Sequence, residues 1–320
     1  MKPDQHLLTI AIPTWNRLKE LKQCLDLVIP QVEVAAPEVE ILISDNASDD
    51  GTEPYGLELQ KRHSFLAYQR NQTNIGASLN FVEAIEKARG AYVWLFSDDD
   101  FMEGGAVAHV LQVIKTWQPA YIASEFTYCD EERKTAHNQP HKKFMIDKDA
   151  PHVNLDRAFL TRNHWLSFVS CNIYRRELCD CALYRAQFPT VPSWIQVYMT
   201  AHVLSQKPDG YVSSFKAVQA RLTEERLIKS AFIFEMAEAF QYVFDQFGVD
   251  ETVAAQVIQE IRATFLPFRS FLALRAAGAS ISSRLVPPYY KMGVLIPSKL
   301  ILATWKAKRF VRGKGYTLPK

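Results

Sequence analysis

Apolar residues in the first 119 positions follow two spacings that alternate along the chain. Strand-like, mostly apolar runs predict four strands, at 7–12, 39–44, 65–70 and 91–96. Apolar residues at every third or fourth position predict a helix after Arg17 and another that Gly90 ends, since glycine is common just past a helix. A third helical stripe runs from Val107 to Ile114 and stops at Pro119. Strands that alternate with helices predict a mostly parallel α/β sheet with helices on both faces.

After residue 119 the pattern is mixed. Apolar runs at 120–128 and 168–174 predict two further strands. The polar stretch 130–149 predicts a loop between them, and a short helix is expected from Arg176.

Beyond Thr223 the apolar spacing becomes that of long helices. It predicts one helix at 224–247 and another at 251–277, the second kinked near Pro267. We therefore expect an α/β domain in two halves followed by a helical C-terminal region, with bounds of about 1–118, 119–222 and 223–320.

Ligands of parallel sheets bind beyond the carboxyl ends of the strands, so the residues after each predicted strand are the first site candidates. The first strand leads into Pro13, which stops its hydrogen bonding, and then Thr14, Asn16 and Arg17. Thr14 and Asn16 precede a helix whose free N–H groups suit an anion, and Arg17 offers a charged fork for phosphate. The alternative is that Thr14 or Asn16 only caps the helix.

The second and third predicted strands also lead into polar residues. Asp45 and Asn46 begin a run of turn-forming residues, which by itself indicates a plain loop. Asp45, however, directly follows a buried strand, where a carboxylate without a partner is costly, and the N–H donors of a pyrimidine ring would satisfy it. The third strand leads to Asn71, Asn74 and Gly76, and Gly76 suits a positive φ or a close backbone approach.

Three consecutive aspartates, Asp98, Asp99 and Asp100, follow the fourth predicted strand. Their charges repel one another, and their position after a buried strand serves no purpose in packing. Oxygen-rich clusters of this kind suit Mg²⁺ or Mn²⁺, which also bind phosphate oxygens. A solvated turn is the alternative, but the apolar run before the cluster favours a metal site.

Taken together, these segments resemble the family 2 glycosyltransferases of the GT-A fold. The resemblance lies in the first strand with its nucleotide loop, the base-recognising segment, an Asn-x-Gly element and the Asp-x-Asp region, at 10–17, 44–52, 74–80 and 96–101. Each motif alone is weak, but the four occur in the family's order over roughly residues 7–101. The resemblance is therefore specific, and it implies a GT-A-type nucleotide-binding domain.

The resemblance implies a nucleoside diphosphate sugar as donor and Mg²⁺ or Mn²⁺ on its diphosphate, with Asp45 against the base. The residues implied to border the nucleotide are Pro13, Thr14, Asn16, Arg17, Asp45, Asn46, Asn74 and Gly76. Two registers of the metal cluster stay open. Either Asp98 and Asp100 are the outer pair, or Ser97 takes the first acidic place and Asp99 is the main ligand.

The second half departs from the family's pattern. Members usually carry an acidic residue at the start of a helix in the acceptor region, where a base removes the proton of the attacking hydroxyl. The corresponding stretch, 192–196, contains no carboxylate. Glu125, near a strand end, is the substitute candidate. Asp180 is another, although it is expected to face solvent on a helix, and His202 is expected to be a packed helix histidine. This departure and the 96–101 segment most resemble the abequosyltransferase-like subgroup that builds O-antigen.

The charge of the chain is divided unevenly along its length. Residues 261–320 contain twelve Lys or Arg and no Asp or Glu, whereas residues 1–260 contain 25 basic and 35 acidic side chains. Such a tail predicts an anionic partner, and an anionic membrane surface is favoured because aromatic residues are interleaved with the basic ones after Pro287. The alternative is a basic face packed on the acidic body. Nucleic acid is not expected, because no nucleic-acid motif accompanies the charge.

The remaining features bear on location. Five cysteines at irregular spacing are expected to be reduced, as in the cytosol. The sequence has neither a recognisable leader nor an apolar run of about 18 residues, so we expect a cytoplasmic protein that rests at most on the inner face of the cell membrane.

The predicted function is metal-dependent transfer of a hexosyl or deoxyhexosyl group to a hydroxyl of a lipid-linked glycan in surface polysaccharide synthesis. The family's usual chemistry inverts the stereocentre in a single displacement. The alternative is a non-catalytic sugar-nucleotide-binding subunit of a polysaccharide assembly complex. A nucleotidyltransferase is disfavoured, because the glycine-rich phosphate loop expected near the N-terminus is missing.

Overall fold

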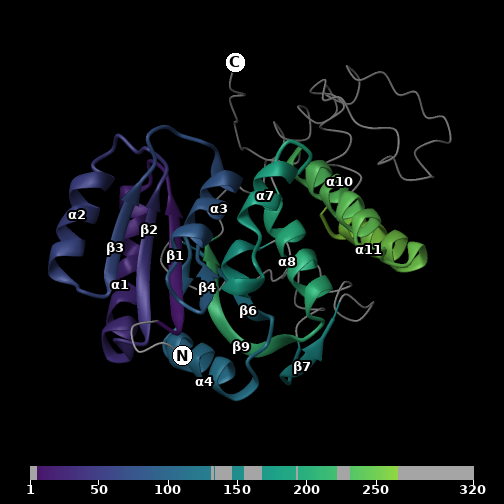
Figure 1. Ribbon diagram of the computed structural model, residues 1–320, viewed down its shortest axis with the longest axis horizontal. Helices are drawn as coiled ribbons and strands as arrows, with labels where there is room; N and C mark the ends of the chain where they lie inside the picture. The colour runs from purple at the N-terminus through teal and green to yellow at the C-terminus, as the bar shows by residue number, and fades with distance from the viewer. Residues whose placement is uncertain are drawn as a thin grey trace, which may run out of the picture.

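The structure of the protein is a computed structural model that describes residues 6–130, 133, 146–154, 168–191, 194–221 and 231–265. Within these residues, nine strands form one mixed sheet (Figure 1). The strands are β1 Leu8–Thr14, β2 Val39–Asp45, β3 Leu66–Arg70, β4 Tyr92–Leu95, β5 Phe101–Met102, β6 Tyr121–Cys129, β7 Ala150–Val153, β8 Asn172–Arg175 and β9 Gly210–Arg221. Their order is β3-β2-β1-β4-β8-β6-β9-β5, and β7 pairs with β9 outside this path.

Helices cover both faces of the sheet, as the alternating pattern predicts. On one face α3 contacts β1, β2 and β4 and packs on α7, which contacts α8; on the other face α1 contacts β2 and α4 (Figure 1). The helices are α1 Leu18–Ala35, α2 Thr52–Arg62, α3 Ala77–Lys87, α4 Ala106–Trp117, α7 Cys181–Gln187, α8 Ile195–Gln206, α10 Ala231–Gln246 and α11 Glu251–Phe265. Two 3-10 turns, η2 Val169–Cys171 and η3 Arg176–Leu178, lie on either side of β8.

The four strands predicted for the first half, and the helices predicted between and after them, are confirmed. The role predicted for Gly90 is wrong, because α3 ends at Lys87 with Ala88 as its C-cap. A Cβ atom at residue 90 would lie 2.5 Å from the backbone nitrogen of Thr9. Glycine is needed there because the chain passes close to β1, not because a helix ends.

The second half differs more from the sequence prediction. The run 120–128 forms β6, but the predicted strand 168–174 begins as the turn η2 and becomes β8 only at Asn172. The turn is held by Ser170, whose hydroxyl accepts from the backbone N–H of Ser97. The long strand β9 was not predicted, because polar residues interrupt its apolar alternation.

The strand directions bring several strand ends to one edge of the sheet. β2, β3 and β4 run parallel to β1 and to one another, and β8 runs antiparallel to both β4 and β6. β6 and its parallel partner β9 therefore run in the direction of β4. We call the edge where these strands end the carboxyl edge; the residues at the strand ends are Thr14, Asp45, Leu95, Cys129 and Arg221.

The C-terminal helices lie beyond this sheet. α10 packs on α8 and on α11, and its buried residues include Phe240 and Phe244 (Figure 1). Both helices agree with the prediction over the described residues. The predicted kink at Pro267 and the basic tail lie outside those residues. In the part of the chain that the structure describes, no helix is long and apolar enough to cross a membrane.

Candidate functional site

The first two strand ends lie side by side because of their register. Thr14 of β1 is paired with Asp45 of β2, and Asp45 is paired with Arg70 of β3. Between β1 and β4 the pairing stops earlier, at Ala11 and Leu95. Pro13 therefore ends the hydrogen bonding of β1 only on the β4 side, while it still pairs with Ser44 on the β2 side. The resulting opening between β1 and β4 is where the residues after β4 meet those after β1.

Two of the three aspartates converge in this opening. Nη1 of Arg17 donates to Oδ1 of Asp98 at 3.0 Å and to Oδ2 of Asp99 at 3.1 Å. The hydroxyl of Thr14 donates to the other oxygen of Asp98 at 2.7 Å, and the hydroxyl of Ser97 donates to the other oxygen of Asp99 at 2.5 Å. One oxygen of each carboxylate is thus held by a hydroxyl group, and the other accepts from the Arg17 guanidinium, which the two carboxylates share.

Burial shapes the charge of this pair. Asp98 and Asp99 are buried, whereas the Arg17 side chain is 49% exposed. Burial raises the pKa of the Asp98 carboxyl to about 6, and the Arg17 guanidinium opposes this shift. At neutral pH the Asp98 carboxyl is therefore mostly ionised and offers a negative oxygen to a cation.

Asp100 points away from this pair. The hydroxyl of Ser170 donates to its Oδ2 at 2.6 Å, and the backbone N–H of Arg221 donates to its Oδ1 at 3.3 Å. Asp100 is completely buried. Its carboxylate joins the segment after β4 to the turn before β8 and to the end of β9.

The aspartate cluster therefore differs from a three-carboxylate clamp. In the described part of the chain, no three His, Cys, Asp or Glu side chains come together as a metal-ion ligand set. Asp98 and Asp99 nevertheless aim one hard oxygen each at the same nitrogen atom, which is an arrangement that one divalent cation fits. Asp98 and Asp99 contact this nitrogen alike, so both registers left open by the sequence stay predictions.

Asp45 lies at the end of β2 with all its surface buried. Its Oδ1 accepts from the backbone N–H and the hydroxyl of Ser48, and its Oδ2 accepts from the hydroxyl of Tyr68 at 2.6 Å. Nε of Arg70 lies 3.6 Å from the same Oδ2. The protein itself therefore satisfies this carboxylate, so the argument that it needs an outside partner is wrong. Contact between Asp45 and a base stays a prediction from the resemblance.

Asparagine side chains connect the segments after β2 and β3. Oδ1 of Asn46 accepts from the side chain of Asn71 and from the backbone N–H of Ile75. Nδ2 of Asn46 donates to Oδ1 of Asn74, which also accepts from the backbone N–H of Gly76. Gly76 has φ 85°, as predicted, and a Cβ atom there would meet nothing within 4 Å. The structure thus brings Asn46, Asn74 and Gly76 together at the carboxyl edge.

Asn16 also takes an unusual backbone conformation, with φ 50°. Its backbone N–H donates to the hydroxyl of Ser48, and its Oδ1 accepts from the backbone N–H of Asp49. Asn16 therefore fastens the loop after β1 to the loop after β2. The helix-cap alternative fails for it, since Arg17 is the N-cap residue of α1 and the side chain of Asp50 accepts from the backbone N–H of Leu18, the first residue of that helix.

The acceptor-side candidates differ in burial, and Glu125 is the one enclosed by the fold. Glu125 is the fifth residue of β6, not a residue at its end, and it is completely buried at an irregularity in the pairing with β9. Its Oε1 accepts from the backbone N–H of Ile146. Asp180 caps α7 by accepting from Leu183, and His202 packs against Tyr184, whose hydroxyl lies 3.0 Å from its Nδ1. As expected, Asp180 is exposed and His202 is a packed helix residue.

Arg221 is a residue that the sequence did not single out. Its guanidinium lies over the ring of Phe101 at 4.4 Å and donates to the side chain of Gln23, so it lies beside the aspartate cluster. Arg221 lies near the cluster because β9 pairs with β6. Neither its residue type nor its neighbours in the sequence indicate that pairing.

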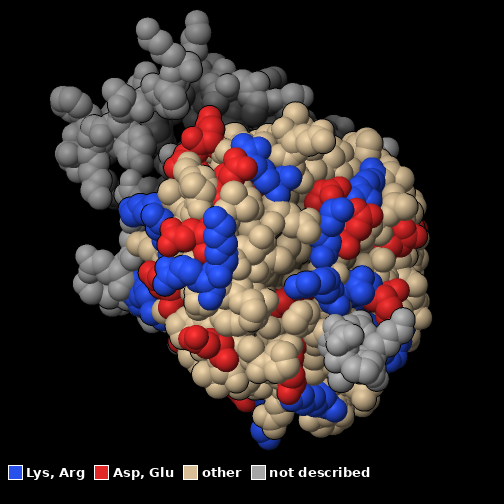
Figure 2. Space-filling view, turned by 60° about the vertical axis from the view of Figure 1, so that its left-hand side comes forward, with Lys and Arg blue, Asp and Glu red and all other residues tan. Residues whose placement is uncertain are grey.

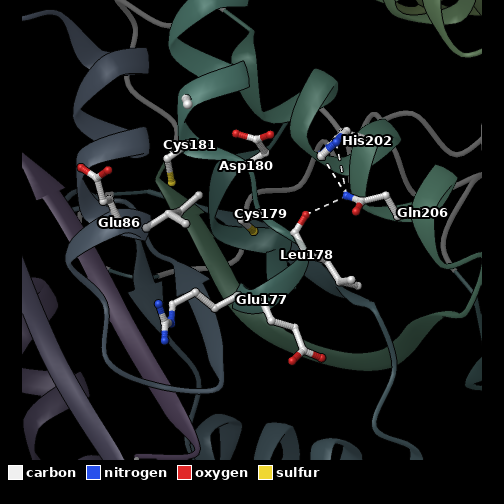
Figure 3. A pocket seen from close by; sticks show the side chains of 11 residues that line it. Glu86, Glu177, Leu178, Cys179, Asp180, Cys181, His202 and Gln206 are labelled. Carbon is white, nitrogen blue, oxygen red and sulfur yellow. Dashed lines mark hydrogen bonds between the residues drawn. The ribbon is translucent and has the colours of Figure 1, made fainter.

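A polar pocket lies at the opposite edge of the sheet, near the end of α3 and the start of α7 (Figure 3). Its volume is about 550 Å³, and its lining includes Glu86, Cys179, Cys181 and His202. Within it, the side chain of Gln206 donates to the carbonyl of Leu178. All five cysteines of the chain are free, as expected. This pocket is separate from the carboxyl edge, and two of the acceptor-side candidates, Asp180 and His202, line it.

The exterior offers no large field of one sign on the face shown in Figure 2. Lys and Arg side chains alternate there with Asp and Glu. Examples from the described surface are Arg62 with Glu58 and Lys115 with Glu38.

Comparison with known proteins places these features in a family. The model of glycosyl transferase family 2 matches residues 9–183. Abequosyltransferase RfbV of Salmonella typhimurium is 30% identical over 192 residues, which cover 57% of this chain and 56% of that protein. A GalNAc(5)-diNAcBac-PP-undecaprenol beta-1,3-glucosyltransferase of Campylobacter jejuni is 29% identical over 106 residues, 33% of each chain. The chain thus spans about half of the first relative and a third of the second.

Solved structures share the fold at low sequence identity. S. aureus TarS 1-349 superposes with a TM-score of 0.59 at 16% identity, covering 98% of this chain and 93% of that one. The mannosyltransferase PcManGT of Pyrobaculum calidifontis, in complex with GDP-Man and Mn²⁺, has a TM-score of 0.51 at 14% identity and covers 96% and 81%. These similarities confirm the predicted GT-A-type fold.

Proposed function

The chain belongs to glycosyl transferase family 2, and on that premise we propose that it moves a sugar from a nucleoside diphosphate donor to a hydroxyl group of a glycan. The observation that carries the proposal is the convergence of Thr14, Arg17, Asp98 and Asp99 at the carboxyl edge. These residues lie within the family-matched segment and at the sheet edge where α/β folds bind ligands.

We propose that Asp98 and Asp99 hold a divalent cation, Mg²⁺ or Mn²⁺, and that Asp100 is structural. Their two converging oxygens suit such an ion, and PcManGT was solved with Mn²⁺. A bound divalent cation would neutralise the charge that develops on the departing nucleoside diphosphate. Thr14 and Ser97 orient the two carboxylates, because their hydroxyl groups hold the oxygens on the other side.

The nucleoside is assigned to the loops after β1, β2 and β3. Asn16 joins the first two loops, and Asn46 and Asn74 join the second and third. Tyr68 and Ser48 fix the Asp45 carboxylate beside them. This network gives the donor a rigid surface, which lowers the entropy lost on binding. Pro13 and Gly76 contribute through the backbone conformations that they give to these loops.

The acceptor is proposed to be a lipid-linked glycan of a surface polysaccharide. Support comes from the similarity to an abequosyltransferase and to an undecaprenol-linked glucosyltransferase. On this view residues 1–222 are the catalytic domain, with a donor half to about 118 and an acceptor half from 119, and the basic tail in 223–320 meets anionic lipid at the inner face of the membrane. Liposome co-sedimentation that is unchanged by deletion of residues 288–320 would reject the lipid contact.

Transfer with inversion in a single displacement requires a base for the acceptor hydroxyl. Glu125 remains the proposed base, and its burial means that the acceptor must reach it inside the acceptor half. A second candidate function is a non-catalytic sugar-nucleotide-binding subunit. The observation in its favour is that Trp194 and Gln196, at the start of α8, stand where a family base is expected.

The test is nucleotide release from a panel of UDP-, GDP-, CDP- and dTDP-sugars, with Mn²⁺ and with a chelator, in the presence of a polysaccharide acceptor. The enzyme reading predicts that one donor is consumed and that chelation stops its consumption. A thermal-shift series with the same donors serves as control, because a ligand that binds the folded state raises Tm without any turnover. Stabilisation without release would instead support the binding subunit.

A further inference from the structure

Arg17 is proposed to bind phosphate, although its guanidinium already contacts two carboxylates. Its Nη1 atom contacts Asp98 and Asp99 at almost equal distances, 3.0 and 3.1 Å. Within the described residues, these two contacts are the hydrogen bonds of its guanidinium. The guanidinium therefore lies at the point on which the two carboxylate oxygens converge.

A divalent ion would need the same two oxygens. Because both contact one nitrogen atom, they lie no farther apart than the two N–O distances taken together. Metal–oxygen bonds of about 2.0–2.6 Å require a modest approach of the two carboxylates and the removal of the nitrogen between them. Arg17 and the metal ion cannot hold the pair in the same way at the same time.

The three side chains differ in their freedom to move. The carboxylate side chains are 3% and 9% exposed and are held from behind by Thr14 and Ser97, whereas the Arg17 side chain is 49% exposed. Arg17 precedes the first residue of α1, so its side chain starts at the end of a helix with solvent in front of it. Movement of Arg17 toward solvent leaves the carboxylates in place.

We infer that Arg17 is the resident counter-ion of the Asp98–Asp99 pair and that a divalent cation binds by displacing it. The displaced guanidinium then pairs with the donor's diphosphate, an anion whose geometry its planar fork matches. This second half rests on the proposed function, whereas the displacement itself depends only on the carboxylate geometry. Arg17 thus prevents unbalanced charge in the free protein and becomes a phosphate ligand only in the loaded one.

The first experiment is a Mn²⁺ titration of the full chain, without nucleotide, followed by the loss of the free-ion EPR signal. Arg17→Met, which keeps an unbranched side chain without charge, is expected to bind Mn²⁺ about tenfold more tightly than the wild type, the size of one charge-assisted contact. Arg17→Lys, which keeps the charge, is expected to stay near the wild type. Equal or weaker Mn²⁺ binding by a folded Arg17→Met protein would overturn the inference.

A second measurement uses the unchanged chain, in case the variant does not fold. Mass spectrometry follows the rate at which phenylglyoxal modifies Arg17, with and without Mg²⁺, and Arg62 serves as an exposed reference on the surface. Displacement predicts that Mg²⁺ raises the rate at Arg17 several-fold and leaves Arg62 unchanged. A rate at Arg17 that Mg²⁺ leaves unchanged or lowers contradicts it.

The same variants separate this inference from the proposed function. With Mn²⁺ saturating, the affinity of Arg17→Met for the bare nucleoside diphosphate is expected to fall about tenfold, because one phosphate contact is lost. If Arg17→Met binds Mn²⁺ more tightly but the wild type turns over no donor, the displacement stands and the transferase is rejected. If the wild type turns over a donor but Arg17→Met binds Mn²⁺ as the wild type does, the transferase stands and the displacement is rejected.

Discussion

The proposed donor half and the proposed acceptor half of this protein place their polar groups in different ways. In the donor half, short polar side chains follow consecutive parallel strands, and each is fixed by a neighbour at the same edge, as Thr14 fixes Asp98 and Ser48 fixes Asp45. In the acceptor half, Glu125 lies inside a strand and Arg221 is brought to the site by a strand about a hundred residues later. In the first arrangement one oxygen each of Asp98 and Asp99 faces the half-exposed Arg17 side chain, whereas the second encloses its charges.

The position of a carboxylate relative to its strand determines whether one of its oxygens stays available to a ligand. A carboxylate at a strand end can be held by hydroxyl groups on one side and still offer an oxygen on the other. A carboxylate enclosed by other segments, such as Asp100 after β4 or Glu125 within β6, accepts from a backbone N–H group of one of those segments. We therefore expect changes in the first set to alter ligand binding and changes in the second set to alter stability as well.

The largest effect is expected from Asp99→Asn. The change keeps the shape of the side chain and removes the negative charge that faces the cation, so donor turnover should fall about a thousandfold, or ~4 kcal/mol of transition-state stabilisation. Nucleotide release with saturating Mn²⁺ measures it. The Tm should stay close to that of the wild type, and full turnover in this variant would remove the metal assignment.

Glu125→Gln tests the acceptor half in the same assay. If Glu125 removes the acceptor's proton, transfer should fall about a hundredfold while KM for the donor stays the same. The comparison of donor KM with kcat is decisive, because a purely structural role would lower Tm and change both. Normal transfer by this variant would leave the acceptor half without its proposed base.

Asp100→Asn provides the matched control for Asp99→Asn. Both of its oxygens accept hydrogen bonds in a fully buried position, so replacing one oxygen by an NH₂ group opposes a donor with a donor. We expect the free energy of unfolding to fall by ~2 kcal/mol while Mn²⁺ affinity is retained. Urea unfolding and the EPR titration measure the two quantities, and a lost Mn²⁺ site with unchanged stability would return Asp100 to the metal ligands.

The strands of the donor half could be predicted because the residues that indicate them lie next to one another in the sequence. β1, β2 and β4 are mostly apolar runs, and the residues proposed to bind the donor follow them within a few positions. α2 was missed, since only Thr52, Gly56 and Leu59 of its residues are buried and the apolar stripe is too narrow to detect. Residue 56 of that helix must be glycine, because a Cβ atom there would collide with the ring of Tyr68.

The acceptor half was harder to read, because its elements depend on partners far away. β9 pairs with β6 through a shifted register around Glu125, so its polar residues do not alternate in the way a regular strand would show. η2 forms in place of a strand because Ser170 bonds to Ser97 and Asp100, about 70 residues earlier. No window of the sequence around 168–174 contains those partners.

By itself, the sequence determined the order of strands and helices in the first half and the chemical groups available at their ends, since apolar periodicity and turn residues act over a few positions. Only the tertiary structure decided which groups meet. It turned Asp98 and Asp99 toward Arg17 and Asp100 toward Ser170 and Arg221, although the three aspartates are adjacent in sequence. Adjacent side chains leave the backbone in different directions, and their partners come from strands that the sheet, not the sequence, places beside them.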